Sequence, residues 1–176
     1  MTNNFIITSI SDFKMVEPAL KCVFVPITSL NYSRVREFRH DNRIAEYREK
    51  LAHHEIGYFA ESNGTMVGSI WATINNAQLP AIVRTYMRLM PSEALIHDIV
   101  TGDRFRGMGI GPFMVGRLAS LLLTEYRLLR IIIDVNVRNR PSLRMMDKAG
   151  LQLSQQTLYI SAFGNLVLQK VLKDYP

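Results

Sequence analysis

The sequence predicts an α/β domain built on one mixed sheet, antiparallel at both ends, parallel in the middle and flanked by helices. Three observations indicate this fold class. A turn-forming pair, Asn63-Gly64, separates two strand-like runs, a glycine-rich loop at residues 106–111 joins a strand to a helix, and two further strand-like runs close the chain. At 176 residues and 48% hydrophobic, the chain suits a single domain over residues 1–176.

The N-terminal third predicts one strand and two short helices. Its first residues show no clear pattern. Residues 22–27 are apolar and β-branched, and Pro26 places this strand at an edge or an end. We expect helices at residues 31–39 and 41–52, each beginning at Asn, Ser or Asp residues that can cap it.

The middle of the chain predicts a hairpin. Residues 56–60 and 66–74 flank Asn63-Gly64, a dipeptide that tolerates positive φ and favours a tight turn. Residues 78–92 contain two prolines and no clean period, so we expect a connection there.

The next stretch predicts a strand, a helix and a parallel strand. Residues 94–100 are strand-like, and apolar residues recur at helical spacing from about 109 to 126. Residues 130–135 include three consecutive isoleucines, which is typical of a buried parallel strand. A right-handed crossover then places the glycine loop at the carboxyl end of the sheet, where ligands bind in open α/β folds.

The C-terminal part predicts one helix and two strands. Asn139 can cap the helix and Gly150 can end it. Strands at residues 151–160 and 165–172 then pair antiparallel, turning at residues 163–164.

The glycine loop predicts an anion site, because a helix that opens after glycines presents free N–H groups and the positive end of its dipole. A nucleoside-triphosphate loop would need Lys and Ser or Thr after Gly111, where the chain has Pro112. A dinucleotide fingerprint would need a further glycine after Gly107 and Gly109, again where Pro112 stands. Only Asp134, at the end of the next strand, supports the dinucleotide interpretation.

A third interpretation rests on two motifs. Arg106-x-x-Gly109-x-Gly111 resembles the pyrophosphate-binding motif of the GCN5-related N-acetyltransferase (GNAT) superfamily, whose members bind acetyl-coenzyme A or another acyl-CoA. The segment from Asn139 to Leu151 looks like the family's later motif, in which Asn starts a helix that ends in Lys-x-Gly-Phe. The resemblance covers residues 56–172, and the N-terminal third is too generic to match.

This resemblance implies the acyl-CoA N-acyltransferase fold and transfer of an acetyl group to a primary amine of a small molecule or peptide, with no metal. The amine would attack directly in a ternary complex, with the CoA arm along the strand before the glycine loop. The residues it implies for cofactor binding are Ile99, Val100, Thr101, Arg106, Gly107, Met108, Gly109, Ile110, Gly111, Pro112, Asn139 and Ser142.

His97 is the candidate catalytic base. Its imidazole titrates near neutrality, and strict strand alternation puts it on the same face as Ile99 and Thr101, with Asp98 on the opposite face. The alternative is a buried histidine satisfied by a hydrogen bond.

One position departs from the family pattern. Many members carry a tyrosine where this chain has Met146, and that phenol is thought to protonate the departing thiolate. Methionine has no proton to give. The sulfur is then protonated by water or by another residue such as Tyr159, or it leaves as a thiolate, because a thiol has a pKa of only about 8.5.

Composition restricts the remaining function classes. The net charge of +6 favours anionic partners, but the basic residues are spread over the chain without a nucleic-acid motif. Cys22 is the only cysteine, and no run suggests a signal peptide or a membrane span. We therefore expect a cytoplasmic protein with no nucleic-acid or membrane partner, and a homodimer is possible by family analogy.

Three other functions stay open from the sequence: a noncatalytic acyl-CoA-binding or sensing domain, a nicotinamide oxidoreductase, and a recognition domain without cofactor.

Overall fold

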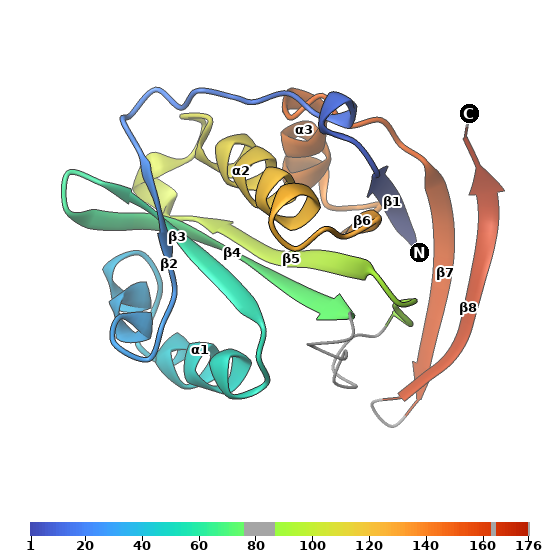
Figure 1. The fold of residues 1–176 in the computed structure, drawn as a ribbon, viewed down its shortest axis with the longest axis horizontal. Helices are drawn as coiled ribbons and strands as arrows, with labels where there is room; N and C mark the ends of the chain where they lie inside the picture. Colours follow the sequence, from blue (N-terminus) through green and yellow to red (C-terminus); the bar gives the residue numbers. More distant parts are fainter. Residues whose placement is uncertain (76–86, 163–164, 176) are drawn as a thin grey trace.

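The computed structural model describes residues 1–75, 87–162 and 165–175, and the side chains of residues 161–167 lie outside that description. Within it, the strands form one eight-stranded sheet in the order β2-β3-β4-β5-β6-β1-β7-β8 (Figure 1). They are β1 (Thr2–Ile7), β2 (Val23–Pro26), β3 (Ile56–Ser62), β4 (Thr65–Asn75), β5 (Glu93–Thr101), β6 (Arg130–Asn136), β7 (Gln155–Ala162) and β8 (Asn165–Asp174). Of the described pairs only β5–β6 is parallel, which confirms the predicted mixed sheet.

Both predicted hairpins are present. β3 and β4 pair antiparallel, and the turn between them has positive φ at Asn63 (49°) and Gly64 (77°), as the dipeptide predicted. β7 and β8 pair antiparallel as well. The turn predicted at residues 163–164 and most of the connection predicted at 78–92 lie outside the described residues.

The N-terminal strand β1 was not predicted, and it lies inside the sheet. It pairs antiparallel with β6 on one side and with β7 on the other. Phe5 and Ile7 are buried, and the buried amide of Asn4 donates to Thr157 Oγ1 at 2.9 Å. The polar start of the strand, which hid it in the sequence, is therefore satisfied by a cross-strand hydrogen bond.

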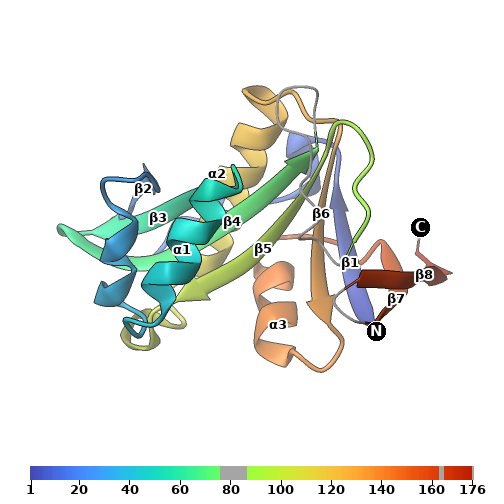
Figure 2. The same cartoon turned by 90° about the horizontal axis from the view of Figure 1, so that it is seen from below.

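Helices cover both faces of the sheet. α1 (Arg43–Ala52) and the 3-10 helix η2 (Tyr32–Glu37) lie on one face, while α2 (Ile110–Thr124) and α3 (Arg140–Lys148) lie on the other (Figures 1 and 2). The helix predicted at residues 31–39 is thus a shorter 3-10 helix. Its cap residue Asn31 bonds instead to the Thr28 N–H and the Pro26 carbonyl.

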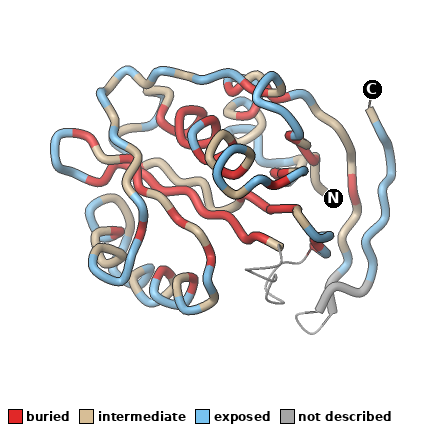
Figure 3. The backbone as a smooth tube through the Cα atoms, viewed as in Figure 1, coloured by how far each residue is buried: buried red, intermediate tan, exposed pale blue. Residues whose placement is uncertain are grey.

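Two apolar clusters hold these layers together. The larger one packs α2 and α3 against the sheet, and Ile70, Ile96 and Leu118 are fully buried in it. On the opposite face, Tyr47 of α1 packs against Phe59 and Trp71. Long buried stretches of the tube in Figure 3 lie on β4, on the first half of β5 and on α2, so the strands that bear the predicted site are anchored in the core.

Candidate active site

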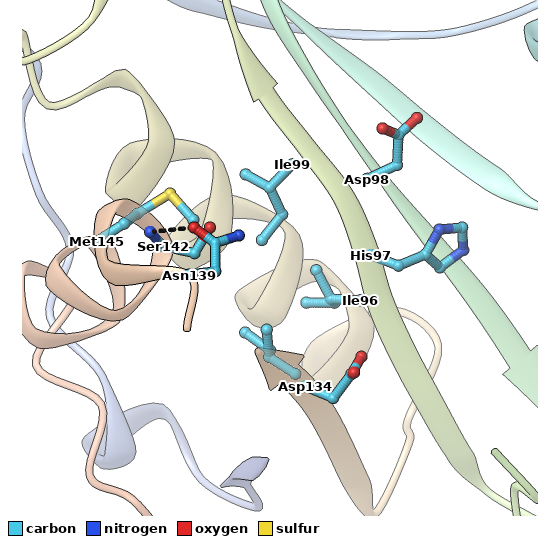
Figure 4. Close-up of a pocket in the computed structure, with 9 residues that line it drawn as sticks. Ile96, His97, Asp98, Ile99, Asp134, Asn139, Ser142 and Met145 are labelled. Carbon is cyan, nitrogen blue, oxygen red and sulfur yellow. Dashed lines mark hydrogen bonds between the residues drawn. The ribbon is translucent and has the colours of Figure 1, made fainter. Parts of the chain in front are cut away.

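β5 and β6 separate in the middle of the sheet. They pair from Glu93↔Arg130 as far as Ile96↔Ile133, and beyond that register β5 pairs only with β4 among the described strands. A cavity of about 280 Å³ lies at this point of separation. Its lining residues come from β5, β6 and the start of α3: Ile96, His97, Asp98, Ile99, Ile133, Asp134, Asn139, Ser142 and Met145 (Figure 4).

A β-bulge interrupts β5 beside this cavity. His97 lies opposite Trp71 and Val100 opposite Ser69, so two residues of β5 face one residue of β4. Asp98 has a φ of 45° at this point. The bulge shifts the alternation of side chains along the strand by one residue.

This shift corrects two expectations drawn from strict alternation. His97 and Asp98 lie on the same face of β5, toward α1, whereas Ile96 and Ile99 point to the other side (Figure 4). Asp98 is therefore not on the face opposite His97, and His97 does not share a face with Ile99.

His97 lies between a hydroxyl and a carboxylate. Its Nε2 is 3.1 Å from Thr73 Oγ1 and 3.2 Å from Glu55 Oε2. The Glu55 side chain is 6% exposed, and among the described residues its Oε2 has no partner in hydrogen-bonding geometry. His97 Nε2 therefore lies within reach of both the Thr73 hydroxyl and the buried Glu55 carboxylate.

The glycine loop opens α2 as predicted. Gly107 and Gly109 have φ values of 81° and 80°, and Gly109 is the N-cap of the helix. Among the described residues, no backbone hydrogen bond is donated by the N–H groups of residues 107–111. A Cβ on Gly111 would lie 2.4 Å from Met145 Sδ, so glycine permits the close approach of α2 and α3. The loop therefore presents free donors beside the cavity.

Asn139 caps α3 as predicted. Its Oδ1 accepts a hydrogen bond from the Ser142 N–H at 3.2 Å, and Gly150, with a φ of 73°, follows the end of the helix. Asn139 and Ser142 both line the cavity. The cap explains the position of Asn139 by itself, and a contact with a cofactor stays a prediction.

Comparison with known proteins identifies this arrangement. A family model described as the acetyltransferase (GNAT) family matches residues 24–151, which is more than half of the chain. The chain belongs to the GNAT acetyltransferase family. A comparison with curated proteins finds no match to the sequence.

Solved structures of GNAT proteins share the fold at low sequence identity. Aminoglycoside N-acetyltransferase AAC(6')-Iy in complex with CoA is 16% identical, with a TM-score of 0.60 over 80% of this chain and 98% of that one. AAC(6')-IG from Acinetobacter haemolyticus is 15% identical, with a TM-score of 0.59 over 80% and 97%. A glucosamine N-acetyltransferase region of a fungal multi-domain β-N-acetylglucosaminidase is 14% identical, with a TM-score of 0.61. That match covers 86% of this chain but only 19% of the fungal protein.

Arg106 of the GNAT loop motif faces solvent in this chain. Its side chain is 71% exposed, and its Nη2 lies 2.7 Å from Asp103 Oδ1, which is 84% exposed. An exposed ion pair of this kind contributes at most about 1 kcal/mol to stability, so a phosphate group could displace Asp103 from Arg106 at little cost. Phosphate binding by Arg106 stays a prediction.

The GNAT tyrosine position is part of the core here. Met146 is fully buried in the cluster under α2, and the neighbouring Met145 lines the cavity instead. Tyr159 lies elsewhere, against Leu95 and Ile132, and its hydroxyl accepts a hydrogen bond from Asn4 Nδ2 at 3.2 Å. Burial raises the pKa of Tyr159, so its phenol holds its proton firmly.

The sequence did not single out three residues that surround the site. Glu55 and Thr73 contact His97, and Lys50 of α1 contacts Asp98. Strand pairing between distant segments brings them together, and no local pattern marks them. Within the described part of the chain, no group of three or more His, Cys, Asp or Glu residues could hold a metal. There, too, no helix is long and apolar enough to cross a membrane.

Proposed function

We propose that this GNAT protein is an N-acyltransferase that transfers an acetyl group from acetyl-CoA to a primary amine of a small molecule or peptide. The observation that carries the proposal is the junction of two features. Met145 lines the cavity between the separating strands β5 and β6, and it also lies against Gly111 of the glycine loop, whose N–H groups have no backbone partner among the described residues.

The loop and the cavity fit the two ends of a CoA thioester. Free N–H groups at the start of a helix attract a pyrophosphate, because they add to the positive end of the helix dipole. The unpaired edge of β5 at residues 97–101 can hydrogen-bond the amide-rich pantetheine arm. The structure of AAC(6')-Iy in complex with CoA, which shares the fold, supports this assignment.

The reaction would be a single displacement at the thioester carbonyl. The amine nitrogen forms a bond to the carbonyl carbon, the carbon–sulfur bond breaks, and the sulfur leaves with the electron pair as the CoA thiolate. The proton lost by the amine goes to His97, where Glu55 Oε2, 3.2 Å away, would stabilise the imidazolium. A backbone N–H of the bulge stabilises the oxyanion that forms in between.

The leaving group needs no acid from the protein. A CoA thiol has a pKa of about 8.5, so its thiolate is a tolerable leaving group near neutral pH. Met146 is buried in the core and Tyr159 is bonded to Asn4, so neither position supports a phenolic acid at the sulfur. Cys22 lies outside the cavity, and burial raises the pKa of its thiol, which disfavours a covalent route.

The charges around His97 favour a basic acceptor. Glu55 is buried beside it, and Asp134 lines the same cavity. Carboxylates near the reacting amine attract its ammonium form from solution. The similar solved structures include aminoglycoside N-acetyltransferases, and a polyamine of that kind is the first acceptor to test.

Two measurements test the proposal together. The melting temperature is recorded with saturating acetyl-CoA, CoA or NAD, and thiol release from acetyl-CoA is followed over a panel of amines. A ligand present at 100 times its Kd adds about 2.7 kcal/mol, which raises the melting temperature by roughly 5–10 °C. We expect this shift with both CoA compounds and thiol release with at least one amine. Binding without release would indicate a sensing domain, and a shift with NAD alone would contradict the proposal.

A further inference from the structure

Asp98 adopts a backbone conformation that needs support. Its φ of 45° falls within a β-strand, at the bulge opposite Ile70. A residue other than glycine held in such a conformation costs about 1–3 kcal/mol, and it persists where the surroundings fix it. Asp and Asn tolerate this region better than most residues, which is consistent with the residue type but does not fix the geometry by itself.

The surroundings that fix Asp98 are two cations from the α1 side of the sheet. Arg39 Nη1 donates to both carboxylate oxygens of Asp98 at 3.2 Å, and Lys50 Nζ donates to Oδ2. Asp98 is 19% exposed, Lys50 8% and Arg39 14%, so the cluster is largely withdrawn from water. Charge-assisted hydrogen bonds in such surroundings are stronger and more directional than surface pairs.

The cations are themselves held in place. Lys50 Nζ lies 5.2 Å from the centre of the Trp71 ring and 5.5 Å from that of Tyr47. Arg39 Nη1 also donates to the Tyr47 hydroxyl at 3.3 Å, and that hydroxyl is bonded to Ser69 Oγ of β4. Tyr47 and Trp71 are fully buried. The Asp98 carboxylate is therefore attached to a rigid part of the fold.

The peptide groups next to Asp98 border the cavity. Within the described part of the chain, β5 has no pairing partner on the β6 side after Ile96, and residues 96–99 all line the cavity (Figure 4). A bulge reorients the peptide groups around it, so the φ of Asp98 decides which N–H groups between residues 97 and 100 face the cavity. The Asp98 side chain itself is bonded to Arg39 and Lys50 on the α1 side of the strand.

We infer that Asp98 is a positioning residue: clamped by Arg39 and Lys50, it holds the β5 bulge so that a backbone N–H donates to the acyl carbonyl of the bound thioester. This inference rests on the proposed function and adds the residues that place the oxyanion donor. Loss of one such donor costs roughly 100-fold or more in kcat in enzymes that use one.

The test compares three variants of the full chain. Asp98→Ala removes the clamp, Asp98→Asn keeps the tolerance for positive φ and weakens the clamp, and Glu93→Gln is the matched control. Glu93 lies at the other end of β5 and forms a partly buried ion pair with Arg130 at 2.6 Å, outside the cavity. Readouts are kcat, the Kd of CoA, the melting temperature and the ¹³C chemical shift of the carbonyl in bound [1-¹³C]acetyl-CoA.

We expect the carbonyl resonance of the wild type to move downfield on binding, as a hydrogen-bonded carbonyl does. In D98A it should return toward the free value while kcat falls roughly 100-fold and the Kd of CoA, which lacks the carbonyl, changes less than about threefold. D98N should lie between the two, and E93Q should match the wild type in kcat and in the carbonyl shift.

A D98A protein that keeps the wild-type carbonyl shift and kcat would overturn the inference. So would a parallel loss of CoA affinity, melting temperature and kcat with the carbonyl shift unchanged, since that is the signature of a merely structural ion pair. If D98A does not fold, D98N gives the same comparison. A wild type that binds acetyl-CoA with a shifted carbonyl but never transfers it removes the proposed transferase and leaves the inference standing, whereas a wild type that binds no acetyl-CoA removes both.

Discussion

His97 lies on β5 at the edge of the cavity, where its side chain contacts β4 and the segment between α1 and β3. Its ring contacts Thr73 on β4 and the buried Glu55 before β3. A hydrogen bond to Thr73 alone would fit a histidine that is merely satisfied in the core. The additional contact with the buried Glu55 carboxylate fixes the orientation of the ring, which favours a positioned base over a merely satisfied histidine.

This assignment gives a prediction for His97. General base catalysis contributes typically 10²–10⁴-fold, so we expect His97→Gln to lower kcat/KM for amine acetylation by roughly 10²-fold or more at neutral pH. Loss of activity should be smaller at high pH, where the acceptor amine is already neutral. Steady-state rates between pH 7 and 10 measure both effects. His40→Gln, at an exposed position outside the cavity, is the control. Equal rates for H97Q and H40Q would remove His97 from the mechanism.

The charge state of Asp98 gives a second prediction, for stability against acid. Burial alone would raise the pKa of this carboxyl, but the Lys50 and Arg39 charges outweigh it and hold the pKa below its ordinary value of 3.8. The folded state therefore binds the proton less readily than the unfolded state. The ion pairs stabilise the fold above about pH 4, and this contribution is lost as the pH falls through the folded pKa.

Melting curves measure this contribution. We expect the wild type to melt above D98N at pH 6 and the gap to narrow as the pH falls toward 3. The Glu37 carboxyl, whose pKa is also lowered, is paired with Arg34 and not with Asp98, so it titrates in both proteins and cancels in the difference. A gap that stays constant down to pH 3 would show that the Asp98 charge does not support the fold.

At the scale of elements, the glycine loop and the bulge have different origins in the sequence. The loop is a local device: glycines at 107 and 109 take positive φ and the helix starts directly after them. The same holds for the Asn139 cap and the Asn63-Gly64 turn. Each could be predicted because it depends on a few adjacent residues.

The bulge depends on pairing between β4 and β5, so the residues next to it in the sequence do not indicate it. Strict alternation therefore assigned Asp98 and Ile99 to the wrong faces of β5 relative to His97. Glu55 and Lys50 are ordinary surface residue types that become buried only through the packing of α1 and β3. For that reason the glycine loop and the Asn139 cap could be predicted from the sequence, and the contacts of His97 could not.

The loop geometry predicts that two glycine substitutions lower stability alike but affect the affinity for CoA differently. Gly109→Ala and Gly64→Ala both place a side chain at positive φ, 80° and 77°, and each should cost roughly 1–2 kcal/mol of stability. Only G109A alters the donors beside the cavity, so we expect it to weaken CoA binding about tenfold or more while G64A leaves the Kd unchanged. Calorimetric titration with CoA and urea unfolding measure the two effects. Equal Kd values for both variants would argue against the loop as the pyrophosphate site.

In the molecule as a whole, the N-terminal strand β1 connects the two parts of the sheet. β1 lies between β6 and β7, so among the described strands the β7–β8 hairpin pairs with the rest of the sheet only through β1. No alternating pattern in the first residues predicts this role, because burial on both sides replaces alternation with a mixture of apolar and hydrogen-bonded polar residues. The strand order could not be derived from the hairpins alone.

This topology makes the first residues important for stability. Ile7 is fully buried between the sheet and α2, whereas Ile10, three residues later, is 47% exposed. We expect Ile7→Ala to cost about 2–5 kcal/mol and Ile10→Ala less than about 0.5 kcal/mol of the free energy of unfolding in urea. Similar costs for the two variants would contradict the placement of β1 inside the sheet.

We propose that the separated strands β5 and β6, together with the N–H groups of residues 107–111, which have no backbone partner among the described residues, hold an acyl-CoA. Titration of the protein with acetyl-CoA, observed by backbone amide NMR, tests this proposal. We expect acetyl-CoA to bind saturably and to cause the largest changes in amide chemical shift at residues 97–101 and 107–111. Saturable binding that leaves those two segments unchanged, or no binding at millimolar acetyl-CoA, would contradict it.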